Sequence, residues 1–361
     1  MKNVNNRSTP SKKYEMFQDR DWYNLRSILG NDWAMFYFLL GGREAGKSYA
    51  VLRFFVSQWR EKKRPFTWMR LTETSKAKLL ANNAEKLVDP DIRRYFNLDL
   101  ITKGDNVYEV IERDAKGKVL KKELMCRVLA LSTFYNDKGS GLFDKDFLSD
   151  PDMYYNICLD EMNKEKCEKR TQDILYSFSN QLENLIRSTK EKVRIICIGN
   201  TLEEASDILS GINFIPEEFG RYKLHKKRTV IDYIPLNDAY KKRREGTAAA
   251  ILTPESSTFT NKIRLRTDRI SRQKLVKPTC IVKFGAEESK WFTIWDSTII
   301  NKYHGEKIHN EVNMCPYEGG KFIKEKKDQV FTNFLLEQYL FHNLITFKQF
   351  QKQLQLLKPN G

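Results

Sequence analysis

The chain has 361 residues, more than one average domain needs, so its length predicts two or three domains. Hydrophobic residues make up 40% of it, enough for packed cores, and no apolar run reaches the ~18–20 residues that span a membrane. Residues 1–13 are polar and basic and lack the apolar stretch of a secretory signal. Six cysteines and four histidines show no metal-ligand spacing, which argues against zinc and favours a reducing, cytosolic setting.

Positive charge gathers in the C-terminal part of the sequence. The formal net charge is +16, from 63 Lys and Arg against 47 Asp and Glu. Residues 221–361 hold 27 of the basic and 14 of the acidic side chains, whereas residues 1–220 are nearly balanced. This distribution predicts that the second part touches a polyanion, with a merely solubilising basic surface as the alternative.

A glycine-rich loop organises the N-terminal part. Residues 33–40 are an apolar run long enough for a buried strand, and residues 48–59 have the pattern of a helix. Between them lies a match to the pattern G-x-x-x-x-G-K-[ST], made of Gly41, Gly42, Arg43, Glu44, Ala45, Gly46, Lys47 and Ser48. Its glycines let backbone N–H groups point at phosphate oxygens, at the positive end of the helix dipole.

This loop predicts an ATP site, with a plain glycine-rich turn as the alternative. Lys47 would reach the β- and γ-phosphates, and the Ser48 hydroxyl would bind Mg²⁺.

Residues 66–71 predict a second strand, and Arg70 near its end is a further candidate nucleotide contact. Residues 72–75 then resemble a helix N-cap before a helix over residues 76–88. Residues 107–131 alternate and turn like a β-hairpin, interpreted as an insertion beside a core sheet.

Two acids end the next predicted strand. Residues 154–159 are apolar and are followed directly by Asp160 and Glu161. An apolar strand ending in Asp-Glu, downstream of a phosphate loop, is the Walker B arrangement. Asp160 would hold Mg²⁺ and Glu161 would polarise the attacking water. The alternative is a solvated strand end.

A fourth strand carries a candidate sensor residue. Residues 171–188 predict an amphipathic helix, which Arg187 ends, and residues 194–199 predict a strand. Asn200 follows at the strand tip, where many such ATPases sense the γ-phosphate, although a simple turn residue fits equally well. Strands alternating with helices indicate an α/β fold with a mainly parallel sheet and nucleotide at the carboxyl ends of its strands. The Glu after the Walker B Asp, with a strand between Walker A and Walker B, is typical of RecA-like (ASCE) P-loop ATPases.

The character of the sequence changes near residue 221. We expect an ATPase domain over residues 1–220, a linker over 221–258, and a basic α+β domain over 259–361. Within the last, residues 279–284 and 290–295 predict a hairpin, and residues 331–350 a helical, aromatic-rich tail. A basic segment near its start suits contact with a phosphate backbone, through Lys262, Arg264, Arg266, Arg269 and Arg272.

Taken together, these motifs resemble the DNA-packaging (encapsidation) ATPases of small Picovirinae-type podophages, compact relatives of the terminase large subunit. The resemblance rests on the loop at residues 41–48, Trp68-Met69-Arg70, Leu159-Asp160-Glu161-Met162, and Arg187 with the strand leading to Asn200. It covers the first ~220 residues well. Over the C-terminal third it is one of length, order and charge.

The resemblance implies partners and further site residues. Members of the family form a homo-oligomeric ring, expected to be a pentamer, on the portal (connector) of an empty capsid in the host cytoplasm. They use ATP and Mg²⁺ to drive double-stranded DNA inward, and a structural RNA is a further expected partner. Arg187 matches the arginine finger that reaches a neighbouring subunit, Arg43 is expected to contact phosphate, and Lys138 is expected at the subunit interface or on DNA.

The C-terminal domain of large terminases is an RNase H-like nuclease, which needs clustered carboxylates for two metals. Here Lys283 stands on the expected first strand and Asp296 ends the next, without a close partner carboxylate. We therefore expect a vestigial RNase H-like domain that binds rather than cuts. The leading hypothesis is an ATP-driven translocase of double-stranded DNA. The alternatives are a terminase with a working nuclease, a P-loop nucleic-acid-binding switch, and a helicase, for which we find no single-strand platform.

Overall fold

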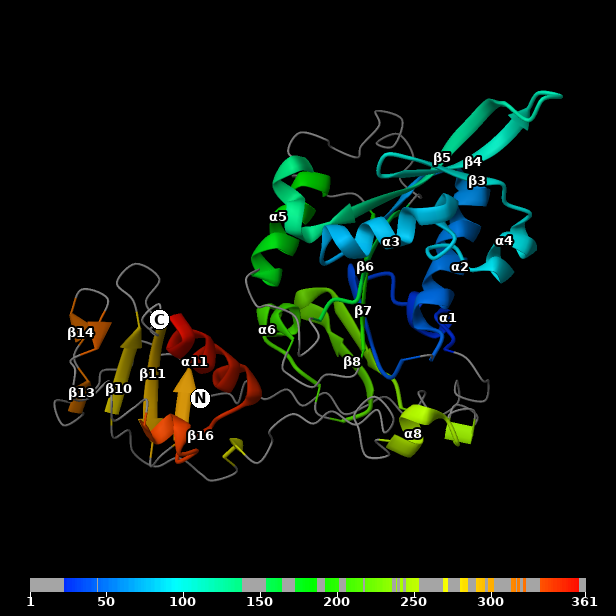
Figure 1. The fold of residues 1–361 in the computed structure, drawn as a ribbon. Coiled ribbons are helices and arrows are strands. Elements are labelled where there is room, and N and C mark those ends of the chain that lie inside the picture. Colours follow the sequence, from blue (N-terminus) through cyan, green and yellow to red (C-terminus); the bar gives the residue numbers. More distant parts are fainter. Residues whose placement is uncertain are drawn as a thin grey trace. The chain divides into compact units, whose positions relative to one another are not determined.

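The computed structural model divides the chain into two compact units (Figure 1). The first holds Met1–Ile208 and Pro216–Ile263, and the second Leu209–Ile215 and Arg264–Gly361. The structure describes residues 23–43, 45–137, 154–163, 173–186, 192–200, 206–216, 218–235, 238, 241–242, 245–252, 269–271, 280–284, 290–295, 298–301, 313–315, 317–318, 321–322 and 332–356.

A nine-stranded sheet forms the centre of the first unit, in the order β3-β4-β5-β2-β6-β7-β1-β9-β8. Its strands are β1 (Phe36–Leu40), β2 (Phe66–Arg70), β3 (Leu100–Lys103), β4 (Asn106–Arg113), β5 (Val119–Ala130), β6 (Tyr155–Asp160), β7 (Val193–Gly199), β8 (Gly220–Leu224) and β9 (Thr229–Tyr233). All neighbours from β5 to β9 in this order run parallel. The prediction of a mainly parallel α/β sheet is confirmed, and its four predicted strands are β1, β2, β6 and β7.

The register of three central strands sets the position of the site. Strand β7 lies between β1 and β6, as expected for a RecA-like sheet. Ile198 of β7 pairs with Leu39 on one side and with Asp160 on the other. The carboxyl ends of β1, β6 and β7 are therefore level, and the segments that follow them meet at one edge of the sheet.

Helices cover the sheet because its central strands are apolar on both faces. In β1, Tyr37 and Leu39 join the core cluster that α2 (Lys47–Lys62) completes with Phe55 and Trp59, whereas Phe38 points to the other face. The remaining helices of this unit include α1 (Arg26–Leu29), α3 (Glu73–Ala84), α4 (Pro90–Phe96), α5 (Ile174–Ile186) and α8 (Ala248–Leu252), with the short 3₁₀ segments η2 (Leu131–Asp137) and η4 (His225–Lys227). A further short helix, α6, spans Asp207–Gly211.

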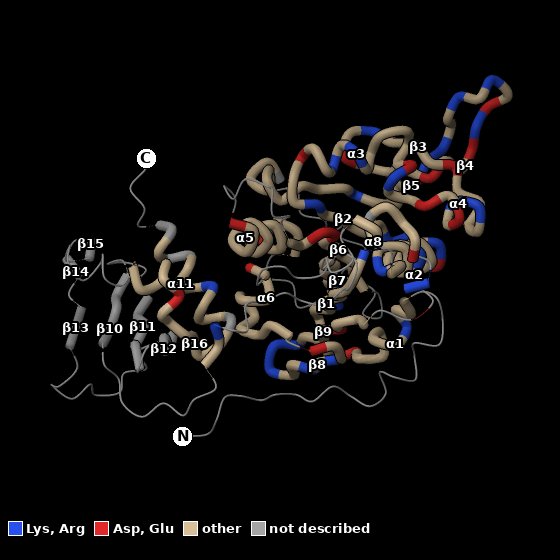
Figure 2. The backbone as a smooth tube through the Cα atoms, turned by 60° about the horizontal axis from the view of Figure 1, so that its bottom comes forward, with Lys and Arg blue, Asp and Glu red and all other residues tan. Residues whose placement is uncertain are grey.

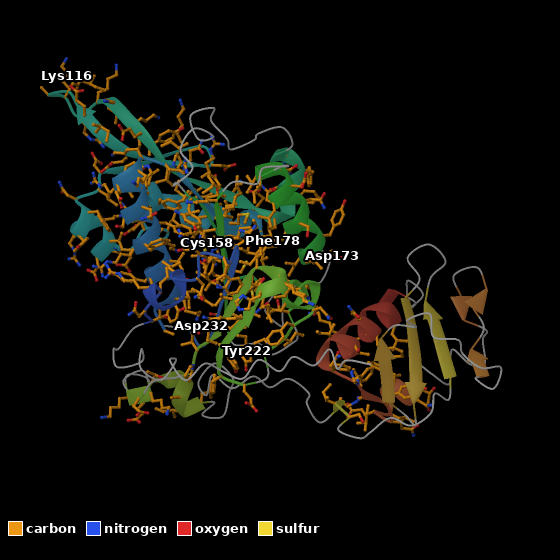
Figure 3. The ribbon with its side chains drawn as sticks, turned by 180° about the vertical axis from the view of Figure 1, so that it is seen from behind. Lys116, Cys158, Asp173, Phe178, Tyr222 and Asp232 are labelled. Carbon is orange, nitrogen blue, oxygen red and sulfur yellow. The ribbon has the colours of Figure 1, made fainter. Side chains whose placement is uncertain are left out.

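Local sequence signals explain where these elements begin. The Thr72 hydroxyl accepts a hydrogen bond from the Ser75 amide at 3.2 Å, which caps α3 as the sequence predicts. Cys158 is a free thiol buried within β6 (Figure 3). Cys197 is a free thiol buried within β7, and both pack as small apolar side chains. Among the described residues, no helix has both the length and the apolar character that crossing a membrane requires.

The predicted hairpin, formed by β4 and β5, is continuous with the central sheet rather than an insertion beside it. The second half of β5 also pairs in parallel with β2, from Cys126 to Ala130. Its first half pairs with β4 alone, so the hairpin extends past the amino ends of the parallel strands, away from the phosphate loop (Figure 1). Asp114 closes the turn by accepting from the amides of Lys116 and Lys118 at 2.9 and 2.8 Å. Lys and Arg residues are frequent along the chain around this tip (Figure 2).

Strands β8 and β9 extend the first unit past residue 220, where we expected the ATPase domain to end. Strand β9 pairs in parallel with β1, the strand that leads into the phosphate loop. Asp232 of β9 is fully buried, and Arg221 of β8 donates to its two carboxylate oxygens at 3.3 and 3.0 Å. Tyr23 donates to the same carboxylate at 2.7 Å, and Arg221 also donates to the Ser27 carbonyl at 2.9 Å. A sequence that looks like a basic linker thus supplies a buried ion pair of the core.

The second unit contains a five-stranded sheet in the order β13-β10-β11-β12-β16. Its strands are β10 (Cys280–Phe284), β11 (Lys290–Trp295), β12 (Thr298–Asn301), β13 (Asn313–Cys315) and β16 (Leu340–Phe341), followed by helix α11 (Leu344–Leu356). A separate two-stranded ladder joins β14 (Tyr317–Glu318) to β15 (Lys321–Phe322). The predicted hairpin is β10–β11, which continues antiparallel into β12, while β13 adds parallel to β10. The second unit is thus α+β, as the sequence predicts, and its RNase H-like character stays a prediction.

Removing one charge of the buried pair should destabilise the first unit. Asp232→Asn leaves the buried Arg221 guanidinium without its counter-charge, and we expect the free energy of unfolding to fall by about 3–5 kcal/mol. Urea-induced unfolding of the full chain measures this. Asp238→Asn is the matched control, because Asp238 pairs with Lys241 on the surface at 3.1 Å and should contribute nothing measurable. Equal losses in the two variants would contradict the buried-pair interpretation.

Candidate nucleotide site

The phosphate loop follows β1 and leads into α2. Gly46 takes a left-handed backbone conformation, with φ of +81°, and this turns the chain into the helix. The first amides of α2 are then free to point at an anion placed over the loop. Lys47, the first residue of the helix, is buried and donates to the carbonyls of Gly41 and Gly42 at 2.9 and 2.6 Å. The loop is therefore folded around the lysine that the motif assigns to the phosphates.

Burial gives Lys47 an unusual acidity. Loss of solvent around the ammonium group lowers the pKa of Lys47 to about 8, and the nearby negative charge of Asp160 offsets only part of that effect. A buried ammonium group that water does not stabilise gains strongly from an added anion. The site thus favours a polyphosphate at the position of the loop.

Ser48 and Asp160 meet although they are far apart in the chain. The Ser48 hydroxyl donates to Oδ1 of Asp160 at 3.0 Å, from the first turn of α2 to the last residue of β6. Burial raises the pKa of Asp160, and the positive charge of Arg70 opposes that rise. A buried carboxylate with incomplete compensation, next to a hydroxyl oxygen, is a suitable donor set for Mg²⁺.

Ser48 and Asp160 form a site with few protein ligands, which suits Mg²⁺ bound together with a nucleotide. Within the described residues, no group of three or more His, Cys, Asp and Glu side chains is arranged to hold a metal ion. Mg²⁺ in nucleotide sites is held by one or two protein oxygens together with substrate phosphates and water. Ser48 and Asp160 match that pattern.

Arg70 joins the two acids at the end of β6. Its guanidinium forms an ion pair with Glu161 and lies 3.6 Å from Oδ2 of Asp160. Burial alone would lower the pKa of Arg70, but Asp160 and Glu161 outweigh it and hold the pKa above its ordinary value. Arg70 therefore contacts the acids of the site from β2, and the nucleotide contact expected from the sequence stays a prediction.

Glu161 has a backbone conformation that few non-glycine residues adopt. Its φ is +59°, in the left-handed region, and its side chain is half exposed. The Met162 amide that follows donates to the Ile198 carbonyl of β7 at 2.9 Å, which fixes the turn after β6. A strained turn held by the neighbouring strand is typical of functional positions.

The end of β7 packs tightly against this turn. Gly199 precedes Asn200, and its carbonyl accepts from the Gly41 amide of the phosphate loop at 3.3 Å. A Cβ at Gly199 would lie 3.1 Å from Nδ2 of Asn163, from Leu40 and from Met162. Asn163 was missed by the sequence analysis. Its only sequence signal is its place two residues after Glu161. Its contact with β7, at Gly199, is visible only in the structure.

The structure places the other candidate residues less closely. Arg43 is exposed on the phosphate loop. Arg269 is 4% exposed in the second unit, where it donates to the Tyr339 carbonyl at 2.9 Å and lies over the rings of Phe334, Phe341 and Phe347. This burial argues against a phosphate contact by Arg269. The candidates outside the described residues are Glu44, Lys138, Arg187, Lys262, Arg264, Arg266 and Arg272.

Comparison with known proteins identifies the architecture. No protein-family model and no curated protein matches the sequence. Among solved structures, the chain is similar to the Phi-28 gp11 DNA packaging motor at 13% identity and a TM-score of 0.58, over 94% of this chain and 99% of that one. It is also similar to the bacteriophage Phi-29 viral genome packaging motor assembly at 15% identity and a TM-score of 0.55, over 92% and 100%. The chain shares its fold with phage DNA-packaging motors.

A third similar structure is the N-terminal domain of the DNA packaging ATPase from bacteriophage phi29. It is 21% identical, with a TM-score of 0.44, and the match covers 60% of this chain and 98% of that one. The first two matches cover more of this chain than its first unit and so extend into the second.

The lowered pKa of Lys47 has a measurable consequence. In the free protein at pH 9 the amine is mostly neutral, because that pH lies above its pKa of about 8. A bound triphosphate favours the charged form, so binding at pH 9 should take up close to one proton, and binding at pH 7 almost none. Isothermal titration calorimetry of ATP in buffers of different ionisation enthalpy measures this uptake. Lys47→Met should abolish it, and equal uptake at both pH values would contradict the assignment.

Proposed function

We propose that the protein is an ATPase that drives double-stranded DNA into a preformed viral capsid. The observation that carries the proposal is the assembly of the phosphate loop, Asp160 and Glu161 at one edge of a RecA-like sheet, in a fold shared with phage packaging motors. Fold likeness at such low identity does not assign an activity, so the proposal rests on the site.

The chain's own residues account for binding of the nucleotide. The amides of the first turn of α2 and Lys47 hold the phosphates, Arg43 adds a cation from the exposed face of the loop, and Ser48 and Asp160 provide oxygen ligands for Mg²⁺. When bound, Mg²⁺ supplies positive charge that neutralises the β- and γ-phosphate oxygens.

Hydrolysis requires a base for the attacking water, and Glu161 is placed to be that base. Its carboxylate is paired with Arg70 through one oxygen, which leaves the other oxygen to accept a hydrogen bond from the water. Arg70 also lies beside Asp160. Asn200, at the tip of β7, completes the edge of the sheet as the residue that contacts the γ-phosphate.

We assign to a neighbouring subunit a further positive charge that stabilises the transition state. Arg187 lies one residue beyond α5 and is proposed as an arginine finger acting in trans, in a homo-oligomeric ring that we expect to be a pentamer. Such an arrangement makes hydrolysis depend on assembly of the ring. The ring would act at the portal (connector) of the capsid, in the host cytoplasm.

DNA contact is assigned to the basic segment of the second unit and to Lys138. After exclusion of the buried Arg269, the proposed contacts are Lys138, Lys262, Arg264, Arg266 and Arg272. The same unit is proposed to bind the portal or a structural RNA and not to cut DNA. In support, Lys283 on β10 stands where a two-metal nuclease requires a carboxylate.

Glu161→Gln tests the hydrolytic assignment. The amide cannot act as a base, so the ATPase rate with double-stranded DNA should fall by about 10²–10⁴-fold while ATP affinity is retained. Steady-state phosphate release and equilibrium nucleotide binding provide the two readouts. Glu112→Gln, an exposed position on the β4–β5 hairpin, is the matched control and should leave both unchanged. Full activity in Glu161→Gln would exclude Glu161 as the base.

Arg187→Ala tests the ring. The variant should assemble and bind ATP but hydrolyse it at a small fraction of the wild-type rate, because a neighbour's cation is missing from the transition state. Mixed into wild-type subunits at increasing ratios, it should lower activity more steeply than simple dilution. A linear decrease with the fraction of variant would show that each subunit acts alone.

A further inference from the structure

Asn163 carries a buried carboxamide that the structure leaves without a hydrogen-bond partner. It lies three residues after Asp160, in the turn that follows β6. Both the Nδ2 and Oδ1 atoms are shielded from solvent, and neither has a partner in the part of the chain that the structure describes. Burial of an amide without a hydrogen bond is unfavourable, and such groups in native proteins concentrate where function requires them.

Two other buried asparagines of the same unit have hydrogen-bond partners. Asn31 is 8% exposed and donates to the Ile28 carbonyl at 2.8 Å. Asn156 is 6% exposed and accepts from Arg194 at 3.0 Å. Asn163 differs from these two, because neither of its polar side-chain atoms has a partner among the described residues.

The surroundings of Asn163 show which part of the site it can affect. Its Nδ2 atom packs against Gly199, where an added Cβ would lie only 3.1 Å away. Gly199 in turn is bonded through its carbonyl to the Gly41 amide at the start of the phosphate loop, and Asn200 follows it directly. Asn163 thus lies where the Walker B turn, the tip of β7 and the phosphate loop meet.

We propose that Asn163 is a positioning residue for hydrolysis, whose carboxamide hydrogen-bonds to Asn200 when ATP occupies the loop and so holds Asn200 toward the γ-phosphate. The inference rests on the proposed function. It accounts for an amide at a position where an apolar side chain of the same shape would avoid the penalty of burial. It also links the turn that carries Glu161 to the residue that contacts the γ-phosphate.

Asn163→Leu gives a test in which stability and activity move in opposite directions. Leucine has a similar shape and no unpaired polar atoms, so the unfolding temperature should rise. The kcat for ATP should fall about a hundredfold, the effect of misplacing a reacting group by ~1 Å, while KM for ATP stays the same. The matched control is Asn31→Leu, which removes an existing hydrogen bond and should lower the unfolding temperature with kcat unchanged.

The coupling to Asn200 is tested by a double-mutant cycle. In an Asn200→Ala background, Asn163→Leu should lower kcat no further, because its effect acts through Asn200. Additive losses would overturn the proposed link. A wild-type kcat in Asn163→Leu, with or without a change in unfolding temperature, would overturn the inference and leave the proposed function standing. Absence of ATP hydrolysis by the wild-type protein would overturn both.

Discussion

The hydrogen bond between Ser48 and Asp160 joins residues that are 112 positions apart, and the candidate site depends on it. It forms because β1, β7 and β6 are parallel and in a register that ends them at the same level. This register brings together the loop after β1, the two acids at the end of β6 and Asn200 after β7. A shift of one residue in the β6–β7 pairing would turn Asp160 to the opposite face of the sheet and separate it from Ser48.

The site holds charge in a region that water scarcely reaches. Lys47 and Asp160 are buried, and Arg70 is largely so, which makes each charge sensitive to the others. Burial lowers the pKa of Lys47 and raises that of Asp160, so both side chains are incompletely compensated. A magnesium-bound triphosphate would provide the missing anion for Lys47 and the missing cation for Asp160. Arg70 connects this pair to Glu161, and so ion binding and the position of the base belong to one electrostatic system.

Much of the first unit was predictable because its signals are local. The apolar runs of β1, β6 and β7, the glycine loop and the Thr72 cap are each contained in a few residues. Other features depend on tertiary context. The charged sequence around Arg221 and Asp232 looks like a linker, yet its two charges neutralise each other inside the core. Arg269 reads as a surface cation in a basic segment, but aromatic rings far along the chain enclose it. Asn163 could not be singled out, because its significance lies in the partner that it lacks.

We propose that a neighbouring subunit completes the hydrolytic site at this edge of the sheet. ATP hydrolysis there would drive the movement of double-stranded DNA. The most direct measurement is the steady-state ATPase rate of the purified chain with and without double-stranded DNA, recorded together with the particle mass. The account predicts a slow rate for the monomer and a rate that rises with DNA as a ring-sized particle forms. A rate that is the same with and without DNA, in a particle that remains a monomer, would contradict it.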